Sequence, residues 1–463
     1  MQNVGRTGRW CLVGAFVAGG WILSAGTGRA QEATQGWLFN LSGAGQQVGQ
    51  ALADKGIYLT GGFLGQSLNV VSGGRQQGSF YDSFTSVGAD FDMNKIAGIN
   101  GGIVHLLVSD LAGQSYANYT GSYFAYAVPY AYGDGFRLNE FSYEQELFDN
   151  RVRILAGRIN LTGDFDISPI QCQFMTTICS NLPGYVFDKS AVGFNTSSWG
   201  ATMTLKPSKP TYVKFGVYED EPSVALSNQM GWPGKDWDFQ SAAGATIPVQ
   251  IGYHTTPQDD PYPRAYDIGG FYDTATYADP LLNTAGQARV LSGGSPLEHT
   301  GRSGVYLQAQ QMVYRPDPKS DRGLTLFGAA NWTTSGETAI ANDVMVGLYD
   351  KGPLASRPND SLGVALTFIA SNHRVTQDID DTIIAQGGTG HVSSEEAALE
   401  VNYGIGLAPG ITLIPFMQYV SHPDQYINPT PSGNLNYSLT VGVGLSIGFN
   451  QALGLPQLTR GGY

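Results

Sequence analysis

Polar and apolar residues alternate in short runs along most of the chain, a pattern that predicts β-strands. The clearest run is 136–165, FRLNEFSYEQELFDNRVRILAGRINLTGDF, which we interpret as two strands joined by a tight turn at Asp149-Asn150. A two-residue turn would place Glu146 opposite Arg153 and gather the charged residues of both strands on one face of the sheet. Those residues are Glu140, Glu144, Glu146, Arg151 and Arg153.

The same alternation recurs from residue 57 almost to the end of the chain. We count about 16 to 18 candidate strands and predict 16, because bacterial outer-membrane barrels have an even number. Besides the hairpin at 138–160, the candidates are 58–70, 80–92, 99–109, 191–205, 212–219, 246–253, 265–274, 305–314, 324–333, 343–349, 362–370, 397–407, 411–420 and 437–449. Residues 41–55 are predicted to form a short helix before the first strand, and 115–128 fit neither class clearly.

The connections between these strands alternate in length. Short turns are expected at 94–98, 148–151, 207–210, 317–322 and 408–410, and longer stretches at 163–189, 220–243, 277–301 and 379–394. Short turns at one end and long loops at the other are typical of an outer-membrane barrel. The fold class we predict is therefore all-β, a transmembrane antiparallel barrel of about 16 strands.

The first 30 residues are predicted to be an export signal. Arg6 and Arg9 precede an apolar run at 10–25, and Gly28-Arg29-Ala30 offers small residues for cleavage after Ala30. A short membrane anchor is the alternative, but the run is interrupted by glycines. We predict a signal peptide at 1–30 and one outer-membrane β-barrel domain at 31–463.

The composition narrows the class of protein further. Charged residues make up 14% of the chain, against about 25% in ordinary soluble domains, and 62 of the 463 residues are glycine. The net charge of −13 and the lack of clustered Lys and Arg argue against a nucleic-acid partner. Beyond the signal no apolar run approaches the roughly 18 residues of a membrane-spanning helix. A secreted β-rich carbohydrate-binding protein, with its apolar faces packed as a core, remains the soluble alternative.

Few residues indicate catalytic or metal chemistry. The six histidines are scattered without metal-ligand spacing, and neither a Gly-x-Ser-x-Gly nor a His-Glu-x-x-His motif is present. We therefore predict no enzyme activity, no cofactor and no metal. Cys172 and Cys179 are seven residues apart in an exported chain, which favours a small disulfide-closed loop over a metal site.

Five segments, taken together and in order, resemble the carbohydrate-selective porins of the OprB type. They are 90–105 (DFDMNKIAGINGGIVH), 155–165 (LAGRINLTGDF), 263–274 (PRAYDIGGFYDT), 347–363 (GLYDKGPLASRPNDSLG) and 400–423 (EVNYGIGLAPGITLIPFMQYVSHP). The resemblance extends over about residues 50–449. The chain then continues beyond Phe449, which would be an aromatic end of the last strand, through QALGLPQLTRGGY.

The resemblance implies passive diffusion of sugars across the outer membrane of a Gram-negative cell, with lipid around the barrel and a homotrimer as the assembly. A general or cation-preferring porin is the alternative, because an acidic lumen favours cations whatever the solute. To the lumen residues of the hairpin, alternation adds Asp90 and Asp92. The family segment adds Arg158 and Asp164, although alternation places Arg158 on the face opposite Arg153 unless a bulge intervenes.

Overall fold

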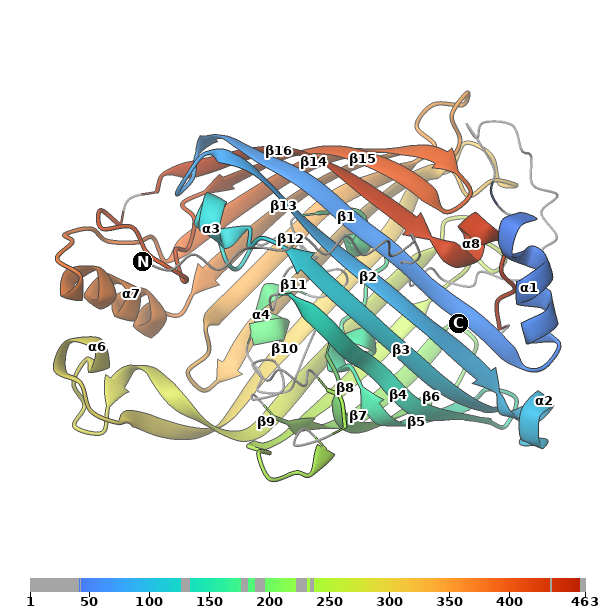
Figure 1. Cartoon of the computed structure of the whole chain (residues 1–463), viewed down its shortest axis with the longest axis horizontal. Coiled ribbons are helices and arrows are strands. Elements are labelled where there is room, and N and C mark those ends of the chain that lie inside the picture. Colours follow the sequence, from blue (N-terminus) through green and yellow to red (C-terminus); the bar gives the residue numbers. More distant parts are fainter. Residues whose placement is uncertain are drawn as a thin grey trace, which may run out of the picture.

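The chain forms a closed barrel of 16 antiparallel strands in the computed structural model (Figure 1). The structure describes residues 41, 43–125, 134–175, 182–187, 196–221, 231–233, 237–433 and 435–458. Each strand pairs with its neighbours in the chain, and β1 (Ile57–Gly73) closes the barrel by pairing with β16 (Tyr437–Gly448). The predicted fold class and strand number are confirmed.

The other strands follow in chain order. They are β2 Gly78–Asp92, β3 Gly102–Gly113, β4 Gly135–Leu147, β5 Val152–Ile159, β6 Ser198–Leu205, β7 Thr211–Asp220, β8 Gly244–His254, β9 Arg264–Asn283, β10 Pro296–Tyr314, β11 Gly323–Ser335, β12 Ile340–Lys351, β13 Ser361–Ser371, β14 Glu395–Ala408 and β15 Ile411–Ser421. The helical elements within the connections are α2 Met93–Ala97, α3 Ala117–Thr120, η2 Leu161–Gly163, η3 Gln171–Gln173, α4 Pro183–Phe187, α6 Arg289–Ser292 and α7 His373–Ala385.

The hairpin of β4 and β5 has the predicted register. Glu146 pairs with Arg153, and the chain turns through Phe148, Asp149 and Asn150, whose φ angles are 55°, 54° and 64°. Asp and Asn tolerate positive φ better than most residues, which suits this pair to the tight turn. The turn chemistry therefore fixes which face each later side chain takes.

The barrel carries its apolar residues on the outside. In β8, Ile247, Val249, Ile251 and Tyr253 are exposed, whereas the alternating residues, among them Gln250, are buried. Exposed aromatic residues also gather near the two ends of the barrel: Tyr253, Tyr266 and Tyr314 at one, and Trp332, Phe368, Tyr419 and Tyr437 at the other. An apolar belt between aromatic girdles is the surface that a lipid bilayer solvates, and a soluble protein with a buried core would invert it.

The two ends of the barrel differ as the turn lengths predicted. The short connections, such as 148–151, 206–210 and 409–410, lie at the end that also carries α1 (Gly43–Ala53) and α8 (Phe449–Leu453) (Figure 1). The long connections leave the strands at the opposite end, between β3 and β4, β5 and β6, β7 and β8, β13 and β14, and β15 and β16. By the usual orientation of such barrels, the short-turn end faces the periplasm and the long-loop end faces outward.

Some expected boundaries were wrong. The stretch 277–301 is not an irregular loop: β9 continues to Asn283 and β10 begins at Pro296, so the hairpin projects beyond the others (Figure 1). Its residues lack clean alternation because a hairpin outside the membrane needs no apolar outer face. The stretch 379–394 contains part of α7, whose buried Val375, Ile379 and Ile383 recur at the four-residue spacing of a helix face.

Three smaller corrections concern strand ends. The predicted strand 99–109 begins at Gly102, and the predicted strand 191–205 begins at Ser198, residues 191–195 lying outside the described part of the chain. Phe449 is not the end of the last strand but the first residue of α8. The segment that follows packs on α1, because a Cβ added at Gly45 or Gly49 would meet Leu455 or Pro456 at 2.8 Å.

A segment between β5 and β6 runs through the barrel interior; we call its described residues, 160–175 and 182–187, the crossing segment. Leu161, Phe165 and Tyr185 pack with inward residues of β5, β7, β9 and β10. Phe174 and Leu182 pack against β11, β12 and β13. Met175 and Val186 contact residues of β1, β2 and β15. The crossing segment is thus attached to nearly the whole inner circumference.

Within the described ranges, the structure contains no helix long and apolar enough to cross a membrane.

The membrane-facing outer surface leads to a stability prediction. Val249→Lys, near the middle of β8, should lower the free energy of unfolding from lipid vesicles by about 2–4 kcal/mol, because it places a charge at the bilayer midplane. Tyr253→Lys, at the short-turn end of the same strand, should cost about 1 kcal/mol or less. Denaturant titration of the protein in vesicles measures both, and equal losses would contradict the proposed membrane position.

Candidate functional site: a charged inner wall

A continuous series of charged side chains runs along the inner wall from β2 to β7. Asp90 Oδ1 lies 2.6 Å from His105 Nδ1, and His105 Nε2 lies 3.5 Å from Glu144 Oε2. Arg153 Nε donates to the same Glu144 oxygen at 2.7 Å. These residues belong to successive strands, β2 to β5, and the pairing of the strands places their side chains on one face.

The crossing segment joins this series through Asp164. Its Oδ1 lies 3.5 Å from Arg153 Nη1 and 3.1 Å from Lys214 Nζ, which also donates to the Asp164 carbonyl at 2.6 Å. Burial acts to raise the pKa of Asp164, but the charges of Lys214 and Arg153 outweigh it, so the pKa lies below its ordinary value. The carboxylate therefore stays ionised at neutral pH and ties the crossing segment to β5 and β7. We call Glu144, Arg153, Asp164 and Lys214 the wall cluster.

Exposure divides the wall cluster into two kinds of residue. The Glu144 side chain is completely buried, whereas Arg153 and Asp164 keep 13% and 12% of their side-chain surface exposed. Glu144 therefore makes no direct contact with a solute and acts by holding Arg153 in place and by its charge. Arg153 and Asp164 are partly exposed side chains that carry a donor and an acceptor next to each other.

Beyond Lys214 the wall continues with neutral and acidic hydrogen-bonding groups. Tyr212 Oη donates to Asp267 Oδ1 at 2.6 Å, and His254 Nε2 lies 2.9 Å from the same carboxylate. Gln250 receives two bonds on Oε1, from Tyr306 Oη at 2.7 Å and from the backbone N–H of Asp166 at 3.0 Å. The Asp166 bond anchors the crossing segment to β8, and Gln308 Nε2, which donates to the Ile167 carbonyl at 3.2 Å, anchors it to β10.

The opposite wall holds the crossing segment through its backbone. Both oxygens of Glu400, in β14, accept the N–H of Met175, at 2.9 and 2.8 Å, and Asn402 Nδ2 donates to the Gln173 carbonyl at 2.8 Å. Glu400 is fully buried. A buried carboxylate is costly unless such donors satisfy it, so these bonds fix the crossing segment on this side of the lumen.

The structure does not bring all of the predicted lumen residues together. Glu140 accepts a hydrogen bond from Ser142 at 2.6 Å, and Glu146 pairs with Arg153 in the strand register. Asp92 ends β2 and caps α2, accepting the N–H groups of Asn94 and Lys95. Arg151 lies exposed in the turn before β5. Both Asp92 and Arg151 therefore lie at the short-turn rim.

Arg158 occupies the opposite face of β5 from Arg153, as strict alternation predicted. It pairs in register with Phe141 and Trp199, and its guanidinium lies 5.8 Å from the Trp199 ring and 3.7 Å from Glu219. The Arg158 side chain is completely buried in this position. The family segment that suggested Arg158 as a lumen residue therefore does not bring it to the wall cluster.

Cys172 is disulfide-bonded. Its predicted partner, Cys179, lies outside the described residues, so the Cys172–Cys179 pairing stays a prediction. Among the described residues, no group of three or more His, Cys, Asp or Glu side chains is arranged to hold a metal ion.

Two residues of the series from β2 to β7, His105 and Lys214, were missed by reasoning from the sequence, as were Tyr212, Gln250, His254 and Asp267 beyond it. His105 faces Asp90 directly across the β2–β3 hairpin, so the hairpin register could have revealed it. Lys214 contacts Asp164 across 50 residues of sequence, and that contact depends on the path of the crossing segment, which no local pattern encodes.

Comparison with known proteins identifies the family. The model of the carbohydrate-selective porin family OprB matches residues 76–449. Porin B of Pseudomonas aeruginosa is 23% identical over 394 residues, covering 80% of this chain and 84% of its own. The high-pH structure of Pseudomonas putida OprB superposes with a TM-score of 0.77 at 22% identity, covering 90% of this chain and all of that one. Its low-pH structure gives a TM-score of 0.52 at 17% identity, with coverages of 86% and 95%.

The fold is that of a porin. The chain belongs to the carbohydrate-selective porin family, OprB, and is a channel of the outer membrane.

The wall cluster leads to an electrostatic prediction. Glu144→Gln removes the buried charge that compensates Arg153, so the reversal potential in a KCl gradient should move toward anion preference. Glu395→Gln removes one exposed negative charge at the start of β14. It should shift the reversal potential much less, because salt screens charges beyond about 10 Å at 0.1 M. Equal shifts in the two variants would show that the wall cluster does not set the field in the channel.

Proposed function

We propose that this porin passes sugars passively into the periplasm along the charged inner wall, with Arg153 and Asp164 as the groups that contact the solute. The observation that carries the proposal is their pairing: a donor and an acceptor, both partly exposed, lie side by side where the crossing segment meets β5. A sugar hydroxyl is both a donor and an acceptor, so such a pair can replace the water that the hydroxyl gives up.

Charge balance favours an uncharged solute at this point. In the wall cluster two cations, Arg153 and Lys214, face two carboxylates, Glu144 and Asp164, at distances of 2.7 to 3.5 Å. Opposite charges this close largely cancel at longer range, so an ion gains little there, while hydrogen-bonding capacity is retained. Asp90, Glu140 and Glu146 would extend this polar track along β2 and β4.

Binding in a channel must stay weak for the solute to leave. The wall cluster meets this condition because its donors and acceptors already pair with one another. A bound sugar therefore gains only the difference in free energy between its hydrogen bonds to the cluster and the bonds they replace. We do not propose catalysis, because members of this family and fold are channels.

The proposal extends to export and assembly. Removal of residues 1–30 would deliver the barrel beyond the inner membrane, and a homotrimer is the assembly suggested by the porin resemblance.

Sugar selectivity depends, in this proposal, on the paired charges of the hairpin. Liposome swelling should be faster with sugars than with amino acids of matched size, and the double variant Glu146→Gln/Arg153→Gln should reduce that preference severalfold. The barrel should remain folded, as judged by its heat-modifiable electrophoretic mobility.

The matched control also neutralises one acidic residue and one arginine of the same hairpin, at two other positions. Asp149→Asn/Arg151→Gln alters only the turn at the short-turn rim and should leave the preference unchanged. Swelling rates of the unmodified protein that follow solute size alone would contradict sugar selectivity and leave a general porin.

A further inference from the structure

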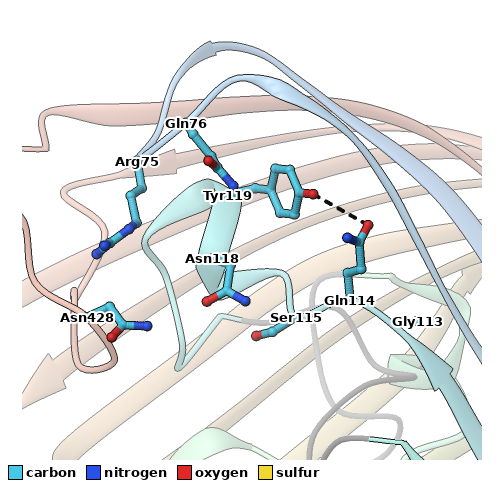
Figure 2. A pocket seen from close by; sticks show the side chains of 8 residues that line it. All are labelled: Arg75, Gln76, Gly113, Gln114, Ser115, Asn118, Tyr119 and Asn428. Atoms are coloured by element: carbon cyan, nitrogen blue, oxygen red, sulfur yellow. Dashed lines mark hydrogen bonds between the residues drawn. The ribbon is translucent and has the colours of Figure 1, made fainter. Parts of the chain in front are cut away.

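A polar hollow opens at the long-loop end of the barrel, away from the wall cluster. It has a volume of about 490 Å³ and is lined by three connections that are distant in sequence (Figure 2). Arg75 and Gln76 come from the turn between β1 and β2, Gln114 and Asn118 from the connection between β3 and β4, and Asn428 from the connection between β15 and β16.

The first two connections are fixed to each other by their backbones. The N–H groups of Arg75 and Gln76 both donate to the carbonyl of Tyr119, at 2.8 and 3.1 Å. Gly74 makes this approach possible: its φ is 67°, and a Cβ there would lie 2.7 Å from the same carbonyl oxygen. The Tyr119 ring, which lines the hollow, is stacked on Phe80 with centroids 4.3 Å apart, and this contact holds it in place.

The third connection is tied to the second by equally direct contacts. The N–H of Gln425 donates to the Gly121 carbonyl at 2.8 Å, and Asp424 Oδ2 accepts the N–H groups of Tyr123 and Phe124 at 2.6 and 2.8 Å. Asp424 is itself buried. The side chain of Asn428 is therefore presented to the hollow by a framework that exists before any solute arrives, which reduces the entropic cost of binding.

The chemistry of the lining is unusual for so acidic a chain. None of the eight lining residues is acidic, and four are amides: Gln76, Gln114, Asn118 and Asn428. Each amide can donate and accept, and the hydroxyls of Ser115 and Tyr119 can do both as well. Figure 2 shows these groups arranged around the hollow, with Tyr119 Oη donating to Gln114 Oε1 at 3.4 Å, longer than an ordinary hydroxyl bond.

We propose that this hollow is a docking site for a neutral saccharide at the outer mouth of the channel, occupied before the solute reaches the wall cluster. A polyhydroxylated neutral solute fits groups that donate and accept in equal measure. Among the eight lining residues a cation would meet Arg75 and no carboxylate, because Asp134, which accepts the N–H of Gly113 at 3.0 Å, is not one of them. An anion would find a single guanidinium in this lining. The inference rests on the proposed sugar passage but concerns different residues.

The test uses glucose as the probe and the double variant Gln114→Ala/Asn118→Ala. Both side chains are exposed, so the barrel should fold unchanged. In proteoliposomes the half-saturating glucose concentration for uptake should rise about fivefold, roughly the effect of losing one net hydrogen bond. The flux at saturating glucose should stay unchanged, because the wall cluster is intact. Asn94→Ala/Gln451→Ala, exposed changes at the short-turn end, should alter neither quantity.

Direct binding separates this inference from the proposed function. Saturation-transfer NMR on the detergent-solubilised porin should detect glucose with the unmodified protein and the control, and several times less with the hollow variant. Glucose binding and half-saturation that are the same in all three proteins would overturn the docking site. An effect on gluconate in place of glucose would also overturn it. If sugars permeate no faster than size-matched solutes while glucose binding is still lost in the hollow variant, the docking site stands and the proposed selectivity fails.

Discussion

Backbone hydrogen bonding in a hydrocarbon environment is the constraint on which the rest of this structure depends. No water is available there to pair with a free N–H or C=O, and each unpaired group costs several kcal/mol, so a spanning sheet must close on itself. The pairing of β1 with β16, from Gly62↔Gly448 to Gly73↔Ser438, removes the last free edge. Closure sends the apolar side chains outward to lipid and leaves the interior to polar residues and to the crossing segment.

The crossing segment is held by two kinds of contact that act together. Buried aromatic side chains, Phe165 and Phe174, pack on different parts of the inner wall, while Asp164 and the backbone of Met175 make the polar contacts beside them. The charges of the wall cluster are thus both structural and exposed in part to the lumen. A channel built in this way can present paired donors and acceptors to a solute without leaving an isolated charge in its path.

Much of the barrel could be predicted from sequence, because alternation and turn residues act over a few positions. The register of β4 and β5 follows from Asp149-Asn150. The alternation of side chains along β5 correctly placed Arg158 on the face opposite Arg153, although the family segment suggested the lumen. The contact between Asp164 and Lys214 could not be predicted, because it depends on how a long connection folds back inside the barrel. The length of β9 was missed for another reason: outside the membrane, no apolar face is needed to mark a strand.

The most direct test of this account is the size of the channel when the crossing segment loses its apolar anchors. Phe165→Ala/Phe174→Ala removes two fully buried side chains, each worth about 3–5 kcal/mol. The polymer-exclusion limit of single channels, measured with neutral polyethylene glycols of graded mass, should then move to larger polymers, while heat-modifiable mobility shows the barrel still closed. An exclusion limit equal to that of the unmodified porin, in a folded barrel, would contradict the account, in which these two side chains hold the crossing segment inside the lumen.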